Sequence, residues 1–300
     1  MNRLALGTVV DLETLAAFDG LLWLRTGEAA AKKLCLNQST VSRRTKQCQA
    51  LFGVACSKTD GEWDLLEDAT LLNAERRVHQ QARWAGMAAL RLEGTYWSGP
   101  LLCDPVPSGW MLGLCNIVGA PRNFSLLRLG IVDAWIGAGP DLPEADDPDL
   151  TSLPLSEMPV HCVVAPNHPL LKQSDLSFDD LAAFPSLALP AGAYPKVEKA
   201  LKQVGLWSSP VRMQRYERRL WEGKSESELT VGYATAMSLE LCGDSLLRLP
   251  LDLPIRSGDA LVIKREFEGS EPIALLHQTL LQRLEPLAAR HPEIRIAPQR

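Results

Sequence analysis

The segment CLNQSTVSRRTKQC, residues 35–48, gathers the side chains of this chain that are best suited to bind a polyanion. Residues 29–58 hold six lysines and arginines and no acidic residue, although the whole chain has a net charge of -5. Guanidinium and ammonium groups bind phosphates or guanine edges, and hydroxyl and amide groups can hydrogen-bond to bases or to the nucleic-acid backbone. The segment therefore favours a nucleic-acid surface over the alternative, the solvated face of an ordinary helix.

Three short helices are expected to position this segment. DLETLAAF begins at Asp11, a good N-cap, and spaces its apolar residues along one helical face. Thr26 can cap a second helix, EAAAKKL, and a three-residue turn then leads to Asn37, again a good N-cap. Gly53 can close the third helix as a C-cap.

The third helix has two distinct faces. At roughly 100° per residue, its apolar side is formed by Val41, Thr45, Cys48 and Phe52. Ser39, Arg43 and Lys46 point in the opposite direction. Two helices joined by a short turn, with a basic and hydroxylic outer face, indicate a helix-turn-helix whose second helix enters the major groove.

DLETLAAF, TGEAAAKKLCLNQSTVSR and LFGV, between residues 11 and 54, resemble the winged helix-turn-helix of LysR-type transcriptional regulators. The matching positions are Thr26, Ala30-Ala31, Leu34, Asn37-Gln38 and Ser42-Arg43. The resemblance implies a DNA-binding site that consists of Thr26, Gln38, Ser39, Thr40, Ser42, Arg43, Arg44, Lys46, Gln47 and Lys58. The chain departs from the family at Ser57, where a Phe is usual, and in the wing, KTDGEWDLLED, which is acidic where the family commonly carries Arg.

Residues 68–92 are expected to form one long helix, because the stretch contains no Pro and a single Gly. A coiled-coil seam, broken at Glu75, is indicated by the heptad-spaced Leu71, Val78, Ala85 and Leu92, with Ala82 and Ala89 between them. The alternative is a helical face that packs on its own domain. The LysR resemblance implies a dimer formed by this helix, and a dimer predicts a DNA site with two-fold-related halves. SGP at 98–100 is expected to be a hinge.

From residue 101 onward, apolar strands alternate with helices, which predicts α/β units with mainly parallel sheets. The expected strands are LLCDPV, MLGLCNIV, LGIVDAWIG, PVHCVVA, SLALP, ELTVGYA and ALVIKREF. The expected helices are LSFDDLAAF, YPKVEKALKQVG and PIALLHQTLLQRLEPLAAR. The stretch VVAPNHPLLKQSDLSFDDLAAFPSLAL also resembles the effector-binding region of the LysR-type family.

The resemblance implies an α/β fold class with three parts: a winged helix-turn-helix DNA-binding domain at 1–66, a linker or dimerisation helix with a hinge at 67–97, and an effector-binding domain at 98–300. The last part would have two lobes, like periplasmic binding proteins, with lobe I at 98–158 plus 266–300 and lobe II at 159–265. Lobe I is expected to be shortened, because only PSGW separates LLCDPV from MLGLCNIV, which leaves no room for a full helix.

Candidate effector-binding residues lie where strands end and helices begin. Residues 119–123 are expected to precede a helix whose free N–H groups, beside Arg122, could bind an organic anion. PAGAYPK offers a similar arrangement from the other lobe. The full candidate set, in which each member could equally be an ordinary loop residue, is Ser108, Arg122, Asn123, Gly192, Tyr194, Tyr233 and Thr235.

The sequence contains no recognisable catalytic or metal-binding pattern, since GxSxG, Walker-type and HExxH motifs are absent. The seven cysteines include no CxxC, which favours reduced thiols in a cytosol, and Cys35, Cys48 and Cys56 are expected to be small core residues. No stretch approaches the ~18 apolar residues of a membrane span. A soluble cytoplasmic protein without a cofactor is therefore expected.

Together with these patterns, the LysR resemblance implies a DNA-binding regulator, not an enzyme, that is controlled by a small-molecule effector and assembles as a homodimer or homotetramer. The alternative is a solute-binding protein with a vestigial DNA-binding head. The acidic wing and the shortened lobe keep that alternative open.

Overall fold

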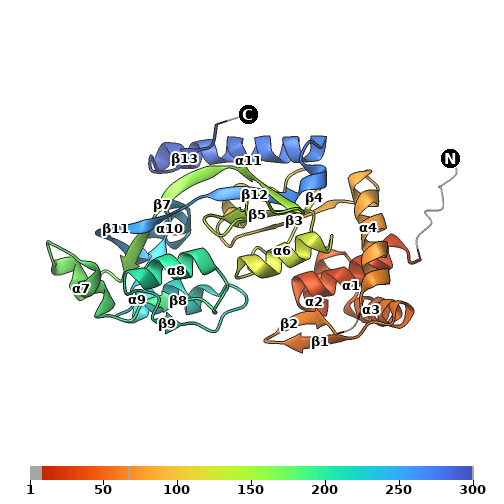
Figure 1. Ribbon diagram of the computed structural model, residues 1–300, viewed down its shortest axis with the longest axis horizontal. Helices are drawn as coiled ribbons and strands as arrows, with labels where there is room; N and C mark the ends of the chain where they lie inside the picture. Colours follow the sequence, from red (N-terminus) through yellow and green to blue (C-terminus); the bar gives the residue numbers. More distant parts are fainter. Residues whose placement is uncertain (1–8, 67, 299–300) are drawn as a thin grey trace. The chain divides into compact units, whose positions relative to one another are not determined.

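The computed structural model describes residues 9–66 and 68–298, which form two compact units. The first unit contains the chain as far as Leu92, together with residues 109–113 and 125–133. The second contains residues 93–108, residues 114–124 and the chain from Ala134 onward. Figure 1 labels the helices and strands of both units.

The first unit begins with three helices, α1 Leu12–Leu24, α2 Gly27–Lys33 and α3 Gln38–Phe52. The side chains of Asp11 and Thr26 each accept a hydrogen bond from a backbone N–H in the first helical turn, at 2.6 and 3.1 Å. Gly53 ends α3 with a φ of +64°, which glycine adopts without strain. These three predicted caps are confirmed. Asn37 also occupies the N-cap position of α3, but its side chain makes no capping hydrogen bond.

The predicted wing is an antiparallel hairpin of β1 Cys56–Thr59 and β2 Glu62–Leu65. Asp60 and Gly61 form its turn with φ values of +50° and +85°, as a tight hairpin turn requires. The Trp63 indole N–H donates to the Arg25 carbonyl at 2.9 Å, and Arg25 Nε donates to the Gly61 carbonyl at 2.8 Å. These bonds fix the wing to the end of α1.

The linker helix, α4 Thr70–Trp84, is shorter than the helix predicted over residues 68–92. Gly86 has a positive φ of +78°, and Leu90–Gly94 form strand β3 instead of further helical turns. Leu92 is completely buried in this strand, so its assignment to a coiled-coil position is wrong. Ala89 likewise lies beyond the end of the helix.

One face of α4 is buried and the other carries an exposed row, here called the α4 stripe, that consists of Leu71, Ala74, Val78, Gln81 and Ala85. Leu71 is 70% exposed and Val78 is 39% exposed. Ala82 lies on the buried face, which corrects its placement in the predicted seam. Glu75 does not break the seam, because it is buried and accepts hydrogen bonds from the backbone N–H groups before α1 at 2.7 and 3.1 Å.

The first strand of the α/β region was predicted in the wrong place. β3 pairs in parallel with β4 Trp110–Leu112, whereas LLCDPV forms the end of helix α5 Ser98–Leu102 and the loop after it. SGP, the predicted hinge, begins that helix. β3 was not predicted, because the charged residues Arg91 and Glu93 are not typical of a buried strand. Both side chains are nevertheless buried, and both are hydrogen-bonded inside the protein. α5 has only five residues, in keeping with a shortened first lobe.

The second unit contains most of the remaining elements. Its strands are β5 Ala134–Ala138, β6 Leu150–Pro154, β7 Ser156–Val164, β8 Leu187–Ala188, β9 Ser209–Pro210, β10 Gly232–Ala234, β11 Leu247–Ser257, β12 Asp259–Lys264 and β13 Arg295–Ile296. Its α-helices are α7 Phe178–Ala182, α8 Pro195–Gln203, α9 Glu222–Ser227, α10 Ala236–Cys242 and α11 Glu271–Arg290, and α6 Ala120–Arg128 contributes residues to both units. Single 3-10 turns form η1 Pro169–Lys172, η2 Arg218–Leu220, η3 Gly243–Ser245 and η4 Arg265–Phe267.

The strands form a five-stranded sheet of order β4-β3-β5-β12-β6 and a second sheet in which β10, β11 and β13 all pair with β7. Among the described pairs of the second unit, only β8 with β9 is parallel, so the prediction of mainly parallel sheets is wrong there. β11 and β12 follow each other through Gly258 but belong to different sheets. A Cβ at Gly258 would lie 2.0 Å from the Ser156 carbonyl oxygen, so this crossover requires glycine.

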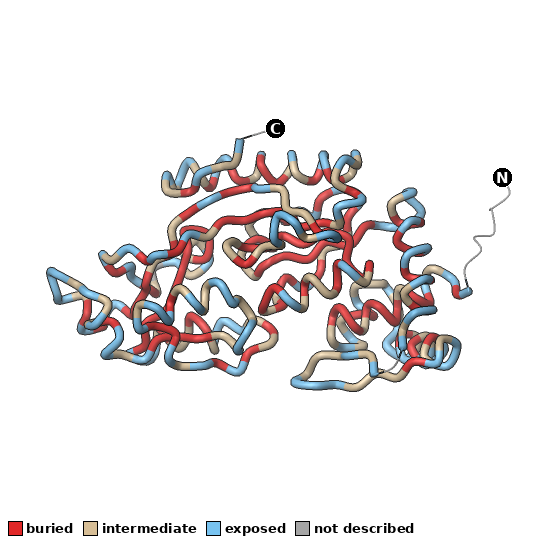
Figure 2. The backbone as a smooth tube through the Cα atoms, in the orientation of Figure 1, coloured by how far each residue is buried: buried red, intermediate tan, exposed pale blue. Residues whose placement is uncertain are grey.

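Buried residues concentrate in the central strands β5 and β12, as Figure 2 shows. α11 packs on the second unit through Leu280 and Leu284, which are fully buried. His277 Nε2 lies 3.0 Å from the carbonyl oxygen of Pro154, and Arg283 donates to the carbonyl of Leu102 at 2.8 Å. α11 is thereby joined to β6 and α5.

Two further expectations can be compared with the structure. No helix within residues 9–66 and 68–298 combines the length and the apolar character needed to cross a membrane. Cys48 is buried, as expected, and burial raises the pKa of its thiol to about 12. Cys56 is partly buried. Cys35 is exposed, at a φ of +53° in the turn before α3, so its assignment to the core is wrong.

Candidate nucleic-acid interface and ligand cavity

The outer face of α3 presents the polar side chains that the sequence indicated. Val41, Thr45 and Cys48 are buried against the other helices. We define the α3 face as its exposed polar residues, Gln38, Ser39, Ser42, Arg43, Lys46 and Gln47. Arg43 and Lys46 have no ion-pair partner among the described residues, so their charges are available to a ligand.

Of the other four members of the predicted DNA site, three have partners within the protein. Successive residues of a helix point about 100° apart, so Arg44 points in a different direction from Arg43. Its Nη2 lies 2.6 Å from Glu13 Oε2 on α1. Lys58 Nζ lies 5.5 Å from the centre of the Trp63 ring, within the range of a cation–π contact. Thr26 uses its hydroxyl to cap α2, and Thr40 is partly buried. The predicted DNA-binding residues therefore include exposed side chains that are available to a ligand and side chains that already contact other parts of the protein.

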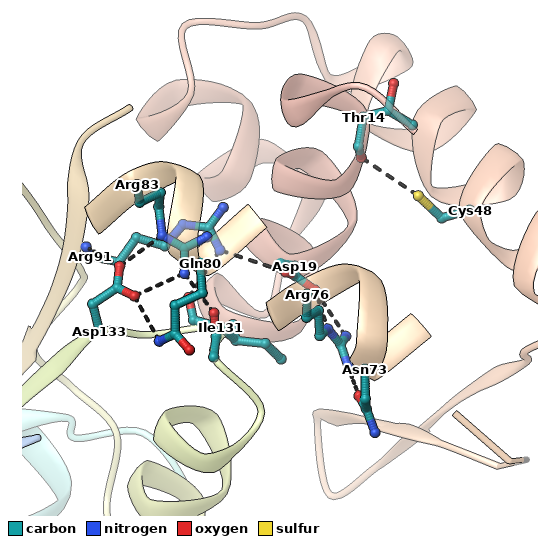
Figure 3. A network of polar contacts seen from close by, with 11 residues as sticks. Thr14, Asp19, Cys48, Asn73, Arg76, Gln80, Arg83, Arg91, Ile131 and Asp133 are labelled. Carbon is teal, nitrogen blue, oxygen red and sulfur yellow. Dashed lines mark hydrogen bonds and ion pairs between the residues drawn. The ribbon is translucent and has the colours of Figure 1, made fainter. Parts of the chain in front are cut away.

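A network of buried charges lies within the first unit (Figure 3). Asp19 of α1 is 1% exposed, and its Oδ1 accepts a hydrogen bond from Arg76 Nε of α4 at 2.9 Å. Arg91 Nη1 of β3 lies 3.7 Å from Asp19 Oδ2. Asp19 therefore connects α1 with both α4 and β3.

Asp133, which precedes β5, is the second carboxylate of this network. It is completely buried and accepts two hydrogen bonds from Arg83, at 2.8 and 2.9 Å. Gln80 Nε2 and the backbone N–H of Arg91 each donate to it at 2.9 Å. Burial, reinforced by Arg83, lowers the pKa of Arg91 to about 10, which still leaves it protonated at neutral pH.

The second unit contains a cavity of about 140 Å³. It is lined by residues that follow β3 and β5 in the five-stranded sheet and by residues of β7, β10 and β11 in the other sheet. None of the described lining residues is charged. The aromatic residues of the lining are Tyr96, Trp97, Tyr194, Trp207, Tyr216, Trp221 and Tyr233.

One wall of the cavity is a stacked pair of tyrosines. The rings of Tyr96 and Tyr216 lie 3.6 Å apart between centroids and are nearly parallel, at 3°. The Tyr216 hydroxyl donates to Glu222 Oε2 at 2.6 Å, and Glu222 is itself buried. Burial, followed by the interaction with Glu222, raises the pKa of both tyrosines, so both phenols stay neutral.

Three tryptophans form other parts of the lining. The Trp97 indole N–H donates to Asp259 Oδ1 at 3.0 Å. Trp207 and Trp221 pack edge to face with centroids 6.5 Å apart, and neither indole N–H has a hydrogen-bond partner among the described residues. Burial raises the pKa of Asp259 to about 6, against the opposing effect of hydrogen bonds from Trp97 and Ser156.

The helix N-termini that were expected to bind an anion already have acceptors. Asp141 accepts the backbone N–H of Lys196 at 2.8 Å and that of Val197 at 3.1 Å, at the start of α8. The N–H of Ala120, which begins α6, donates to the carbonyl of Ala193 at 2.9 Å. The acceptors for these N–H groups thus lie inside the protein.

Only part of the predicted effector site lines this cavity, namely Tyr194, Tyr233 and Thr235. Arg122 and Asn123 lie inside α6 instead of before it, and Asn123 Nδ2 donates to the Gly119 carbonyl at 2.9 Å.

Ser108 and Gly192 are exposed loop residues that do not contribute to the lining. The sequence reasoning missed Tyr96, Trp97, Trp207 and Trp221. These aromatic residues lie in irregular segments of a chain with eight tryptophans, and this was the only sequence feature that could have indicated them.

Parts of the chain resemble known proteins in sequence. Residues 118–220 match the family model of the LysR substrate binding domain. Over 43 residues the chain is 51% identical to the HTH-type transcriptional regulator ArgP of Sodalis glossinidius, which covers 14% of this chain and 15% of that protein. A match of the same length and identity to ArgP of Yersinia enterocolitica covers 14% of each. The matched stretch thus spans only a small part of these relatives.

Solved structures resemble the chain over almost its full length. A full-length OxyR variant from Pseudomonas aeruginosa has a TM-score of 0.57 at 18% identity, covering 97% of this chain and 99% of that one. A full-length BenM variant has a TM-score of 0.52 at 18% identity and covers 97% and 100%. CbnR, solved with its target DNA, has a TM-score of 0.51 at 16% identity and covers 93% and 99%.

At these identities the structural likeness shows the fold: a winged helix-turn-helix, a linker helix and a two-lobed α/β domain. The family model independently identifies the substrate-binding region by its sequence. The chain is therefore similar in sequence to the LysR substrate binding domain over residues 118–220, and similar in fold to these structures over almost its full length.

Proposed function

We propose that this chain is a DNA-binding transcriptional regulator whose α3 face binds duplex DNA and whose aromatic cavity binds a small effector. The observation that carries the proposal is the α3 face itself. Arg43 and Lys46 are exposed and unpaired on a helix whose register is fixed by a buried opposite side. Unpaired cations next to amide and hydroxyl groups are suited to phosphates and base edges.

The same proposal assigns a role to each part of the chain. The DNA-binding domain would occupy residues 1–66, the linker 67–97 and the effector-binding domain 98–300, with the strand β3 now added ahead of residue 98. A regulator of this kind works in the cytoplasm and needs no catalytic group. Closure of the two lobes around an effector would shift the population of DNA-binding conformations.

The α4 stripe supports a homodimer, or a homotetramer built from dimers. Exposed side chains at alternating spacings of three and four residues, all apolar except Gln81, fit a second copy of the same helix. Two copies of the α3 face would then contact a DNA site with two-fold-related halves. Leu71→Glu should shift the protein towards monomer in analytical ultracentrifugation, whereas Arg77→Glu, at an exposed position outside the stripe, should have a smaller effect.

The experiment that tests DNA binding is fluorescence anisotropy on duplex DNA from upstream of the protein's own gene, at several salt concentrations. Wild type should bind with a steep negative dependence on salt. Arg43→Ala should weaken binding, either by about 1–3 kcal/mol with relaxed sequence preference or with a salt slope reduced by about 1. Arg212→Ala, at an exposed arginine of the second unit, is the matched control.

Two results would contradict the proposal. One is a flat salt dependence, and the other is equal binding by wild type and Arg43→Ala. Either result, combined with a ligand in the cavity, would favour the solute-binding alternative, in which the head is vestigial. The exposed Asp60 and Asp64 of the wing are the features that would explain such weak binding.

A further inference from the structure

The lining of the aromatic cavity determines which charge a ligand can carry. Its described residues are aromatic, aliphatic or hydroxylic, and no lysine, arginine or histidine is among them. The described lining contains no aspartate or glutamate either. A charged ligand that enters such a cavity loses its hydration without contacting an oppositely charged side chain, which costs several kcal/mol by rough estimate. The lining therefore disfavours both organic anions and organic cations.

The helix N-termini that could replace a cationic side chain are not free. Asp141, which is 4% exposed, already occupies the start of α8 as an internal carboxylate. The first N–H of α6 is bonded to Ala193, and at the start of α10 a reciprocal capping box bonds the N–H groups of Thr235 and Ser238. A ligand carboxylate would have to compete with these internal acceptors.

Two buried carboxylates, Glu222 and Asp259, lie behind the walls and do not line the cavity themselves. Glu222 receives the hydroxyl of Tyr216, and Asp259 receives the indole N–H of Trp97, so each lies one side chain away from the cavity. Neither carboxylate has an ion-pair partner among the described residues. The indole N–H groups of Trp207 and Trp221 remain unbonded and can donate to an acceptor on a ligand.

The volume limits the size of the ligand. The cavity holds about 140 Å³, and an apolar cavity of roughly 150 Å³ in another protein accommodates benzene. Aromatic walls favour a flat ring, which can pack face or edge against them. From this combination of neutral aromatic walls, filled helix N-termini and single-ring volume, we propose that the effector is an uncharged single-ring aromatic molecule with a hydrogen-bond acceptor. The inference rests on the proposed effector role of the cavity.

The test uses three probes of similar shape and different charge: benzamide, benzoate and benzylammonium. Ligand-observed NMR on the full-length protein at neutral pH measures the affinity of each probe. Benzamide should bind at least ten-fold more tightly than the other two. The proposal is overturned if benzoate or benzylammonium binds as tightly as benzamide, or if benzamide does not bind at its solubility limit.

A cavity-filling variant shows whether the probe occupies this cavity. Leu189 contributes to the lining, so Leu189→Trp should remove benzamide binding. Leu229→Trp is the matched control, because Leu229 is 51% exposed and outside the lining. Equal benzamide binding by Leu189→Trp and wild type would overturn the assignment to this cavity. The ranking of the three probes on wild type holds as a test even if Leu189→Trp folds poorly.

DNA anisotropy on the same preparation separates this inference from the proposed function. Arg43-dependent DNA binding together with a reversed probe ranking would overturn only the ligand class. Absence of DNA binding would contradict the proposed function, whatever the probes do.

Discussion

The two units of the chain stabilise buried carboxylates in different ways. In the first unit, Asp19 and Asp133 are paired with arginines at 2.8 to 2.9 Å. In the second unit, Asp141 and Asp259 are held by neutral donors, namely backbone N–H groups, an indole and a hydroxyl. Arginines thus neutralise Asp19 and Asp133 in the first unit, whereas Asp141 and Asp259 in the second unit have no cationic partner in these bonds.

The difference matters because the two arrangements serve different purposes. A carboxylate that is bonded to several donors at once fixes the elements that carry them, so the Asp133 network makes α4 and β3 a rigid pair. No cation is among the described residues that line the aromatic cavity, so its walls can accept an uncharged ring. The first unit therefore uses its buried carboxylates to hold its elements together, whereas the second unit contains the walls that select the ligand.

The largest expected effect comes from breaking the network of the first unit. Asp133→Ala leaves Arg83 buried without its partner and should lower the free energy of unfolding by about 3–5 kcal/mol. Urea denaturation measures the loss, and Asp252→Ala, at an exposed aspartate, is the control. A loss below about 1 kcal/mol, typical of a surface pair, would mean that the network does not hold the unit together.

The second prediction concerns Asp259, whose pKa burial raises to about 6. Its unfolded pKa is near 3.9, so the folded state binds the proton more tightly and stability falls as pH rises from about 4 through 6. The full loss is about 3 kcal/mol for a shift of about 2 pKa units. Stability of wild type and Asp259→Asn should therefore diverge in favour of the variant over this range. A difference that does not vary with pH would show that Asp259 has an ordinary pKa.

The third prediction tests the internal carboxylate of α8. Asp141→Ala leaves the first N–H groups of α8 without an acceptor and should cost about 1–2 kcal/mol, as loss of a helix cap does. Asp141→Asn keeps an acceptor oxygen and should lose less, by thermal or urea unfolding. If both variants are as stable as wild type, α8 does not depend on this carboxylate.

The smallest effect is expected at the exposed ion pair of the first unit. Glu13 is 73% exposed in its side chain, so Arg44→Ala should change the free energy of unfolding by at most about 1 kcal/mol. Arg44→Ala should also weaken DNA binding less than Arg43→Ala, because Arg44 is engaged with Glu13. The same anisotropy assay compares the DNA affinities of the two variants. A greater loss of affinity for Arg44→Ala would mean that Arg44, and not Arg43, is the main DNA contact.

The sequence determined the head of the protein because its signals are local. Asp11, Thr26 and Gly53 cap helices through atoms within a few residues, and the helical period by itself divides Val41 from Arg43. The same local logic failed after residue 84. The heptad spacing of apolar residues continues into β3, although β3 is a strand. In the sequence, its charged residues look like the exposed face of a helix, and only the structure shows that they have buried partners.

Only the tertiary structure decided which residues line the ligand cavity and which charged side chains form ion pairs. The cavity joins residues from Thr95 to Ser257, which no spacing rule connects, and Asp141 fills the start of α8 from 55 positions away. Arg44 and Arg43 are neighbours with the same chemistry, and the position of Glu13 on another helix distinguishes them. Local hydrogen bonds and periodicity are set by adjacent residues, whereas cavities and ion pairs depend on how distant segments pack.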